Sequence, residues 1–421
     1  MDGRALLLGL LGAAAAGCQG GGGSAPATAT AVAPATSAVV PPAPSLPTST
    51  VPAPVVVPSQ PTPGSRWLHV SNGIQTTQIT TYALDAVSGL PTNPQDTAIV
   101  TTLEGIGKLA CDPVNQILYA SLTVKGPPTI SPMTRPGVLL PIAINNGVLA
   151  PGTPIASGKS DGGGIAVAPS GGSVYMSGSD VGTFILVRGG GVSSFGATPS
   201  GGLTPLNPSF LAAGNAAGEL AFDPSGSFVF CANRADDTVW SFSVQHGSLA
   251  PVAGSPFHTP AGNPGAANHD AVAIAVHPTG KFVYTGNSDT TLSVFQNANG
   301  VLTPTQSLAA NASIWGIYAI AIDPSGNFLY SANGIDGTVS AFQIEPRTGL
   351  LTPLGQPLPL AGSEPVDVVV SSSGHFLYVV DANQGVWALT IATDGTLAPV
   401  AGSPVALPPG DSLPMHAAVS P

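Results

Sequence analysis

A block of three short apolar runs, repeated along the chain, limits the fold more than any other feature of this sequence. The clearest copy spans residues 321–353, where the runs are separated by Asp-Pro-Ser-Gly and by Asn-Gly-Ile-Asp-Gly, and the last run is followed by Gly-Leu-Leu-Thr-Pro. Short β-rich runs bounded by Gly, Pro, Asn and Asp are typical of strands joined by tight turns. A three-stranded antiparallel sheet of this kind cannot bury both of its faces alone, so it needs further copies as neighbours.

Three independent markers count the copies. An aromatic residue or histidine in the second strand recurs at steps of 46 to 56 residues, at His69, Tyr119, Tyr175, Phe230, Tyr284, Tyr330 and Tyr378. The third turn recurs with leucine anchors at Leu90, Leu149, Leu203, Leu249, Leu302, Leu351 and Leu397. The first turn recurs around Pro113, Pro169, Pro224, Pro278, Pro324, Ser372 and Pro421. A period near fifty residues with four short strands is typical of the blades of a β-propeller.

The sequence therefore predicts an all-β, seven-bladed β-propeller with four-stranded antiparallel blades over residues 65–421. We expect the fourth, outer strand after each third turn, for example over residues 356–360. The first copy begins directly at its second strand, residues 66–71, and the chain ends with an isolated first strand, residues 416–421. The C-terminal strand is therefore expected to complete the N-terminal blade and close the ring, which removes free sheet edges between the termini.

The N-terminal segment predicts export. Arg4 is followed by an apolar run, residues 5–16, which is too short to cross a bilayer as a helix and is typical of a signal peptide. Small residues precede Cys18 as in a bacterial lipobox, so residues 1–18 predict a lipoprotein signal with Cys18 as the lipidated residue. A plain secretory signal is the alternative.

Residues 19–64 contain no charged or aromatic side chain and are rich in Gly, Ala, Pro, Ser and Thr. Such a segment lacks the bulk to form a core, so we expect a disordered tether. Together with the leader, it predicts an exported cell-envelope lipoprotein, periplasmic or surface-facing, that touches the membrane only through its lipidated N-terminus.

Charge and composition exclude several function classes. The chain has 10 basic and 21 acidic residues, a net charge of −11, and no basic patch, which argues against a nucleic-acid partner. Cys111 and Cys231 fall on strands of different repeats and are expected to be buried free thiols. The Asn- and Asp-rich second turns lack the ligand density of a calcium site, and no Walker motif occurs. We expect a monomer with no metal and no cofactor.

Candidate functional residues lie where the first strands of the blades line the central channel, at the mouth on the face with the variable loops. Five residues before the first-turn marker stand Lys108, Gly164, Glu219, Ala273, Ala319, Asp367 and His416. Four of these seven are ionisable, although only 7% of the chain is charged. A lysine, two carboxylates and a histidine suit the binding of a polar ligand or acid–base chemistry. The alternative is that they pair with one another and close the opening.

Four further residues on the mouth loops are binding candidates: His269, Asp270, Trp315 and Tyr318. They would supply an aromatic wall or a second base, with surface decoration as the alternative. Lys108 is the one cation that we expect at the mouth.

The repeated motifs resemble those of the seven-bladed lactonase-type propellers, which include 6-phosphogluconolactonase-like and carboxymuconate-cyclase-like enzymes. The motifs are Asp/His-Pro-Ser/Thr-Gly, Phe-Leu/Val-Tyr, Asn-x-x-Asp-x-Thr-Val/Leu-x-x-Phe and Gly-x-Leu-Thr-Pro, clearest in residues 222–251, 277–304 and 323–353. The resemblance implies that His, Arg and Glu at the mouth carry the chemistry. His416 and Glu219 occupy comparable positions here, preceded by Met415 and Gly218.

Two functions follow from these observations. In the first, a lipid-anchored propeller binds a small molecule or protein on its variable face and mouth. In the second, an envelope enzyme hydrolyses a lactone, with His416 as general base, Lys108 stabilising the oxyanion and Glu219 as the third catalytic candidate. Asp367 is then a binding residue.

Overall fold

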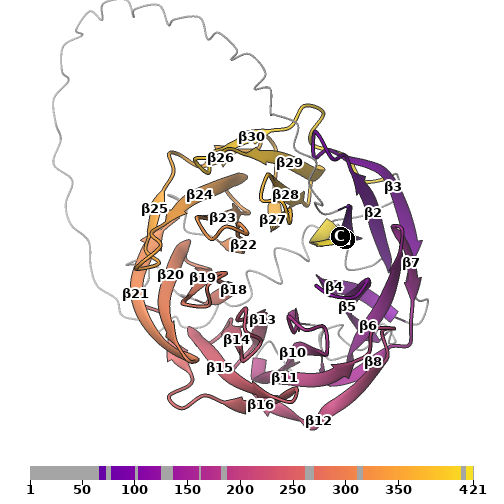
Figure 1. Ribbon diagram of the computed structural model, residues 1–421, viewed down its shortest axis with the longest axis vertical. Helices are drawn as coiled ribbons and strands as arrows, with labels where there is room; N and C mark the ends of the chain where they lie inside the picture. Colours follow the sequence, from indigo (N-terminus) through magenta and orange to yellow (C-terminus); the bar gives the residue numbers. More distant parts are fainter. Residues whose placement is uncertain are drawn as a thin grey trace, which may run out of the picture. The chain divides into compact units, whose positions relative to one another are not determined.

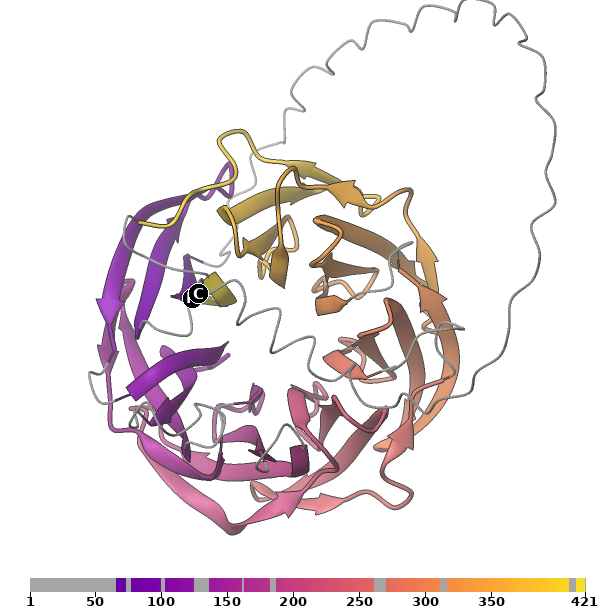
Figure 2. The ribbon, with the colours of Figure 1, turned by 180° about the vertical axis from the view of Figure 1, so that it is seen from behind.

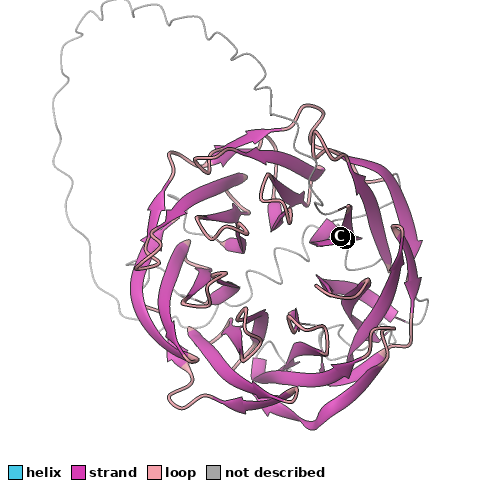
Figure 3. Cartoon of the chain, viewed as in Figure 1, coloured by secondary structure: helices cyan, strands magenta, loops and turns pink. Residues whose placement is uncertain are grey.

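The computed structural model describes residues 66–72, 77–99, 103–124, 136–160, 163–181, 187–260, 270–310, 316–408 and 414–420. The predicted signal peptide, Cys18 and the predicted tether lie outside these ranges. The regular elements in the described ranges are β strands, and none is a helix long and apolar enough to cross a membrane (Figure 3).

The strands form seven antiparallel sheets arranged as a ring, so the predicted seven-bladed β-propeller is confirmed (Figures 1 and 2). We number the blades along the chain and give their strands from the axis outward. Blade 1 contains β31 (Pro414–Ser420), β1 (Trp67–Asn72), β2 (Gln78–Leu84) and β3 (Pro91–Ala98). Blade 2 contains β4 (Leu103–Cys111), β5 (Ile117–Val124), β6 (Pro136–Asn145) and β7 (Val148–Pro151), with β8 (Ile155–Ser160) also paired to β6. Blade 3 contains β9 (Ile165–Val167), β10 (Ser173–Val181), β11 (Val187–Ala197) and β12 (Leu203–Ala212).

The other four blades repeat this order. Blade 4 contains β13 (Ala217–Phe222), β14 (Phe228–Asn233), β15 (Thr238–Gln245) and β16 (Ser248–Pro251), with β17 (Phe257–His258) paired to β15. Blade 5 contains β18 (Ala271–Val276), β19 (Phe282–Asn287), β20 (Thr291–Ala298) and β21 (Val301–Ala309). Blade 6 contains β22 (Ile317–Ile322), β23 (Phe328–Asn333), β24 (Thr338–Ile344) and β25 (Leu351–Pro353), with β26 (Leu358–Pro359) paired to β24. Blade 7 contains β27 (Pro365–Val370), β28 (Phe376–Asp381), β29 (Gly385–Ile391) and β30 (Leu397–Pro399).

The C-terminal strand closes the ring as predicted. β31 pairs antiparallel with β1, from Trp67 opposite Ser420 to Asn72 opposite Pro414. In Figure 1 the yellow C-terminal strand lies inside the indigo N-terminal strands, on the axis side of blade 1. This closure carries His416 to the inner rim, where the other six inner strands present their own residues.

The predicted position of the outer strand is wrong in part. In blade 6 the outer strand already begins inside the third turn, with β25 at Leu351–Pro353, and the expected segment contributes only β26. Leu351 is 3% exposed and pairs with Ile344, so the leucine of the turn motif is itself the first buried anchor of the outer strand. The sequence pattern had marked this leucine as a turn residue only.

Apolar side chains fill the seams between blades, and each of the seven seams has its own buried cluster. The second-strand marker residues lie at the centre of this packing and are 0–1% exposed. Four of the tyrosines also donate a hydrogen bond to a glycine carbonyl in the third turn of the next blade: Tyr175 to Gly247, Tyr284 to Gly349, Tyr330 to Gly395 and Tyr378 to Gly89. The repeated tyrosine therefore ties each of these blades to its neighbour.

The marker residue of blade 1 departs from this pattern. His69 is fully buried, with Nδ1 3.0 Å from Thr81 Oγ1 and Nε2 3.0 Å from Ser420 Oγ on the closing strand. Burial lowers the pKa of His69 to about 3, so the imidazole is neutral at physiological pH. It links three strands of the blade where the two ends of the chain meet.

Cys111 and Cys231 are free thiols, as predicted. Cys231 is fully buried and Cys111 is only partly so. Burial raises the pKa of each thiol to about 12, which keeps both protonated and unreactive.

Candidate functional site at the propeller mouth

Bulges in the inner strands position the candidate residues. In blades 1, 2 and 4 to 7 the pairing of the inner strand with the second strand shifts in register beside the mouth position, for example between Ala217 and Leu220 around Glu219 and between Pro365 and Asp367. The same shift occurs in β4 around Lys108 and in β31 beside His416. A bulge bends its strand and redirects the side chain at that point. The mouth positions therefore lie at matching sites around the axis.

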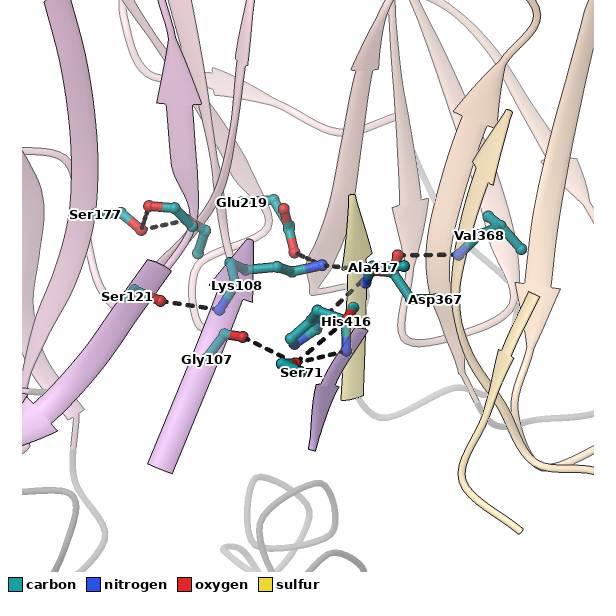
Figure 4. Close-up of polar contacts among 12 residues, drawn as sticks. Ser71, Gly107, Lys108, Ser121, Ser177, Glu219, Asp367, Val368, His416 and Ala417 are labelled. Atoms are coloured by element: carbon teal, nitrogen blue, oxygen red, sulfur yellow. Dashed lines mark hydrogen bonds and ion pairs between the residues drawn. The ribbon is translucent and has the colours of Figure 1, made fainter. Parts of the chain in front are cut away.

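Four of these side chains form one connected group, which we call the mouth cluster: Lys108, Glu219, Asp367 and His416. Lys108 Nζ lies 2.6 Å from Glu219 Oε1 and 3.9 Å from Asp367 Oδ2. His416 Nδ1 lies 3.3 Å from the same Asp367 oxygen. Figure 4 shows the lysine extending between the two carboxylates, with His416 beside Asp367. The side chains of the cluster are 9–17% exposed.

Backbone amides complete the coordination of Asp367. The amide N–H of Ala417 donates to Oδ2 at 3.0 Å, and the amide N–H of Val368 donates to Oδ1 at 2.9 Å. Burial alone would raise the pKa of this carboxyl, but Lys108, His416 and the Ala417 amide outweigh it and hold the pKa below its usual value. Asp367 is therefore ionised at neutral pH.

The same contacts set the charge of the lysine and the histidine. Burial opposes protonation of Lys108, yet the charges of Asp367 and Glu219 outweigh it and raise its pKa. Burial and then the charge of Lys108 lower the pKa of His416, against the opposing effect of Asp367. At neutral pH the cluster thus holds one ammonium, an ionised Asp367 and a neutral imidazole.

This arrangement gives His416 a defined tautomer. Because the neighbouring Asp367 oxygen accepts, Nδ1 of the neutral ring carries the proton and donates it to Asp367. Nε2 is then the unprotonated nitrogen, and no hydrogen bond to it occurs within the described residues. A histidine oriented by a carboxylate, with its second nitrogen free, is the geometry of a general base.

The remaining mouth positions are occupied by small residues. Gly164 lies at the start of blade 3, between Lys108 and Glu219 in ring order, while Ala273 and Ala319 are buried in β18 and β22. The ionisable side chains therefore gather on the side of the ring formed by blades 7, 1, 2 and 4.

Arg234 is a second cation beside the mouth, which corrects the expectation that Lys108 is the only one. It follows β14 directly, it is exposed, and its Nε lies 3.3 Å from the point where a Cβ of Gly218 would be. Its positive charge opposes protonation of Lys108. Among the described residues no carboxylate forms an ion pair with this guanidinium. The missed signal was the glycine before Glu219, which leaves room for a long side chain.

The structure describes two of the four other loop candidates, Asp270 and Tyr318. His269 and Trp315 lie outside the described residues. The backbone carbonyl of Asp270 accepts the amide of Ser288 at 2.9 Å. Tyr318 is half-buried, packs against the apolar cluster between blades 7 and 1 and covers Gly334, and burial raises its pKa to about 12. Tyr318 thus belongs to the packing at a blade seam.

Within the described ranges, no group of three or more His, Cys, Asp or Glu side chains is arranged to hold a metal ion. Lys108 occupies the place between Glu219 and Asp367, so its ammonium supplies the positive charge there.

Comparison with known protein families gives a match to part of the chain. The profile of a family described as "Lactonase, 7-bladed beta-propeller" matches residues 257–370, from the end of blade 4 into blade 7. This match supports the lactonase-type resemblance for that part of the chain. Comparison with curated protein sequences gives no significant match.

Three solved structures share the architecture. A proposed 6-phosphogluconolactonase from Bacteroides uniformis is 17% identical, with a TM-score of 0.68 over 84% of this chain and 98% of that chain. A proposed 6-phosphogluconolactonase from Bacteroides fragilis is 16% identical, with a TM-score of 0.68 over 87% and 100%. A periplasmic gluconolactonase from Pseudomonas aeruginosa is 16% identical, with a TM-score of 0.65 over 84% and 99%. At these identities the likeness shows the fold.

Proposed function

We propose that this protein is a lactone hydrolase whose mouth cluster opens a cyclic ester with water. The observation that carries the proposal is the contact of His416 Nδ1 with Asp367 Oδ2 at 3.3 Å, which leaves Nε2 as a base at neutral pH. The match of residues 257–370 to a lactonase family and the lactonase names of the structural neighbours support the choice of a lactone as substrate.

In the proposed reaction, His416 Nε2 takes a proton from a water molecule, and the resulting hydroxide attacks the lactone carbonyl. Lys108 Nζ has three N–H donors, of which one remains beyond those directed at Glu219 and Asp367, and this donor stabilises the oxyanion. The carbonyl re-forms, the ring C–O bond breaks, and the imidazolium returns its proton to the departing alkoxide. The product is an open-chain hydroxy acid, and Asp367 stabilises the imidazolium between the two proton transfers.

The test is hydrolysis of a panel of sugar and aromatic lactones by the purified full chain, followed by proton release. His416→Ala is expected to lower kcat at least about a hundredfold, as for the loss of a general base. His375→Ala is the matched control, because His375 is exposed in the first turn of blade 7, on the opposite face. A rate that is unchanged in His416→Ala would contradict the mechanism.

A second candidate function is binding without catalysis, of a small molecule or a protein partner on the variable face. The observation that favours it is that Lys108 is already paired with both carboxylates, so the cluster is self-compensated. Replacement of residues 252–270 by a Gly-Ser loop is expected to remove partners from a cell-envelope pull-down under this hypothesis. An unchanged partner list together with lactone turnover favours the enzyme.

We also infer that the protein is exported and held at the cell envelope through lipidated Cys18. The apolar run and small residues before Cys18 and the uncharged segment after it support this location. One structural neighbour is a periplasmic enzyme, which agrees with an envelope location. Radiolabelled palmitate is expected to enter the wild-type chain in a bacterial host. Label that still enters Cys18→Ser would rule out this residue as the anchor.

A further inference from the structure

Three buried serines occupy the same place in blades 1, 2 and 3: Ser71, Ser121 and Ser177. Each lies on the second strand opposite the mouth position of the inner strand. Ser71 and Ser121 face the bulges beside His416 and Lys108, and the amide of Ser177 donates to the carbonyl of Gly164 at 2.9 Å. The corresponding residues of blades 4 to 7 carry no hydroxyl: Ala232, Gly286, Ala332 and Val380. A hydroxyl at this place thus occurs only in one arc of the ring.

Each serine bonds the backbone that carries a residue of the mouth cluster (Figure 4). The amide of His416 donates to Ser71 Oγ at 3.1 Å, and the amide of Lys108 donates to Ser121 Oγ at 2.9 Å. Ser177 Oγ donates to the carbonyl of Gly218 at 2.5 Å, directly before Glu219 in the next blade. The serines therefore satisfy backbone groups that the bulges remove from the strand ladder.

A close backbone approach at Gly164 adds to the hold of Ser177 on blade 4. The amide of Gly164 lies 3.3 Å from the carbonyl oxygen of Gly218. A Cβ on Gly164 would lie 2.7 Å from that oxygen and 2.8 Å from Glu219 Cα, both backbone atoms that no rotamer change can move away. Only glycine at this position lets blade 4 present Glu219 so close to blade 3.

We propose that Ser71, Ser121 and Ser177, with Gly164, are positioning residues that fix the backbone of His416, Lys108 and Glu219 and so set the distances within the mouth cluster. None of the four is proposed to touch substrate. The inference deepens the proposed function, because it names what holds the general base and the cation of that reaction in place. It also stands without that function, since the cluster geometry is measurable without a substrate.

The test uses the opposite effects of Lys108 and Glu219 on the pKa of His416. Lys108 opposes protonation of His416, whereas Glu219 favours it. Release of Lys108 in Ser121→Ala is therefore expected to raise the pKa of His416. Release of Glu219 in Ser177→Ala or Gly164→Ala is expected to lower it. Displacement of either charged side chain is expected to shift the pKa of the neighbouring imidazole by about half a unit or more. NMR titration of the imidazole signals in the full chain measures both, and the sequence contains only seven histidines.

Two controls separate positioning from general loosening. Ser331→Ala removes an equally buried second-strand hydroxyl that bonds Asn333 in blade 6, a blade that contributes no residue to the mouth cluster. Gly172→Ala adds a Cβ in blade 3 whose nearest contact is Ser170 Oγ at 3.6 Å. Both are expected to leave the His416 titration unchanged.

The outcomes decide the proposal. Shifts of opposite sign in Ser121→Ala and Ser177→Ala support it, and wild-type titration or shifts of one common sign overturns it. If Gly164→Ala does not fold, the two serine variants, which only remove a hydroxyl, still decide. Opposite shifts in a protein that hydrolyses no lactone would leave the positioning role standing and reject the proposed function.

Discussion

Lys108 Nζ lies 2.6 Å from Glu219 Oε1 although the two residues belong to blades 2 and 4, which are not neighbours. The ring position between them is Gly164 in blade 3, which has no side chain to separate them. On its other side the same ammonium lies 3.9 Å from Asp367 in blade 7. One lysine therefore compensates carboxylates from two separate blades across the inner rim.

This central place predicts a stability cost for Lys108→Met. The change leaves Glu219 and Asp367, which are 17% and 9% exposed, close together without their cation. Removal of one partner from a buried ion pair typically costs about 3–5 kcal/mol, and partial exposure reduces this here to about 2–3 kcal/mol. Urea unfolding at pH 7 measures the loss. Lys281→Met, at an exposed site, is the control and should unfold like the wild type.

The lowered pKa of His416 predicts the pH dependence of activity. Burial and Lys108 lower its pKa below the usual 6.5, so the catalytic neutral form persists as the pH falls through 6.5. We expect kcat/KM for a lactone to hold its value at pH 6.5 and to fall only at lower pH. A pH–rate profile of the free enzyme shows this limb. An acidic limb centred at or above pH 6.5 would contradict the assignment of His416 as the base.

His69 predicts acid sensitivity of the ring closure. Its pKa is about 3 in the folded chain and 6.5 when exposed, so above pH 6.5 both states are neutral and the full stability is present. As the pH falls below 6.5 the unfolded chain takes up a proton that the folded chain does not. The free energy of unfolding then decreases by about 1.4 kcal/mol per pH unit towards pH 3.

The measurement is urea unfolding between pH 7 and pH 4 for the wild type and His69→Phe. Phenylalanine already fills the equivalent place in blade 4 as Phe230. It loses the bonds to Thr81 and Ser420, which lowers stability at pH 7, but it removes this proton uptake. The variant should therefore lose stability less steeply with acid, and parallel curves for the two proteins would refute the role of His69.

The closing strand predicts a large effect of a small truncation. Removal of residues 416–421 leaves most of β1 without its inner partner, and the loss of Ala417 and Ala418 exposes the apolar seams against which they pack. We expect loss of the cooperative unfolding transition, measured by circular dichroism on heating. Removal of residue 421 alone, which lies beyond β31, is the control and should keep the transition. A truncated chain that unfolds cooperatively near the wild-type temperature would show that closure is not needed.

Much of the architecture was accessible from local pattern. The turn motifs, the marker aromatics and the leucine anchors each occur once in a blade and recur from blade to blade, so they predicted the strand order, the count of blades and the pairing of β31 with β1. The same register singled out Lys108, Glu219, Asp367 and His416 by their ionisable character. The outer strand of blade 6 was misplaced because the leucine of a turn motif and the first leucine of a strand look the same in sequence.

Tertiary structure alone decided which residues of the mouth cluster contact one another. Which carboxylate Lys108 contacts depends on how far blades 2, 4 and 7 lie from one another, and that distance follows from packing between blades and from the missing side chain of Gly164. The hydrogen bond from Ser177 to the carbonyl of Gly218 is likewise a contact between two blades, 3 and 4. The repeated sequence pattern determines the strands and turns of each blade, because these depend on residues within one repeat. The mouth cluster arises between repeats, so its pairing and the charge of His416 depend on distances that only the closed ring sets.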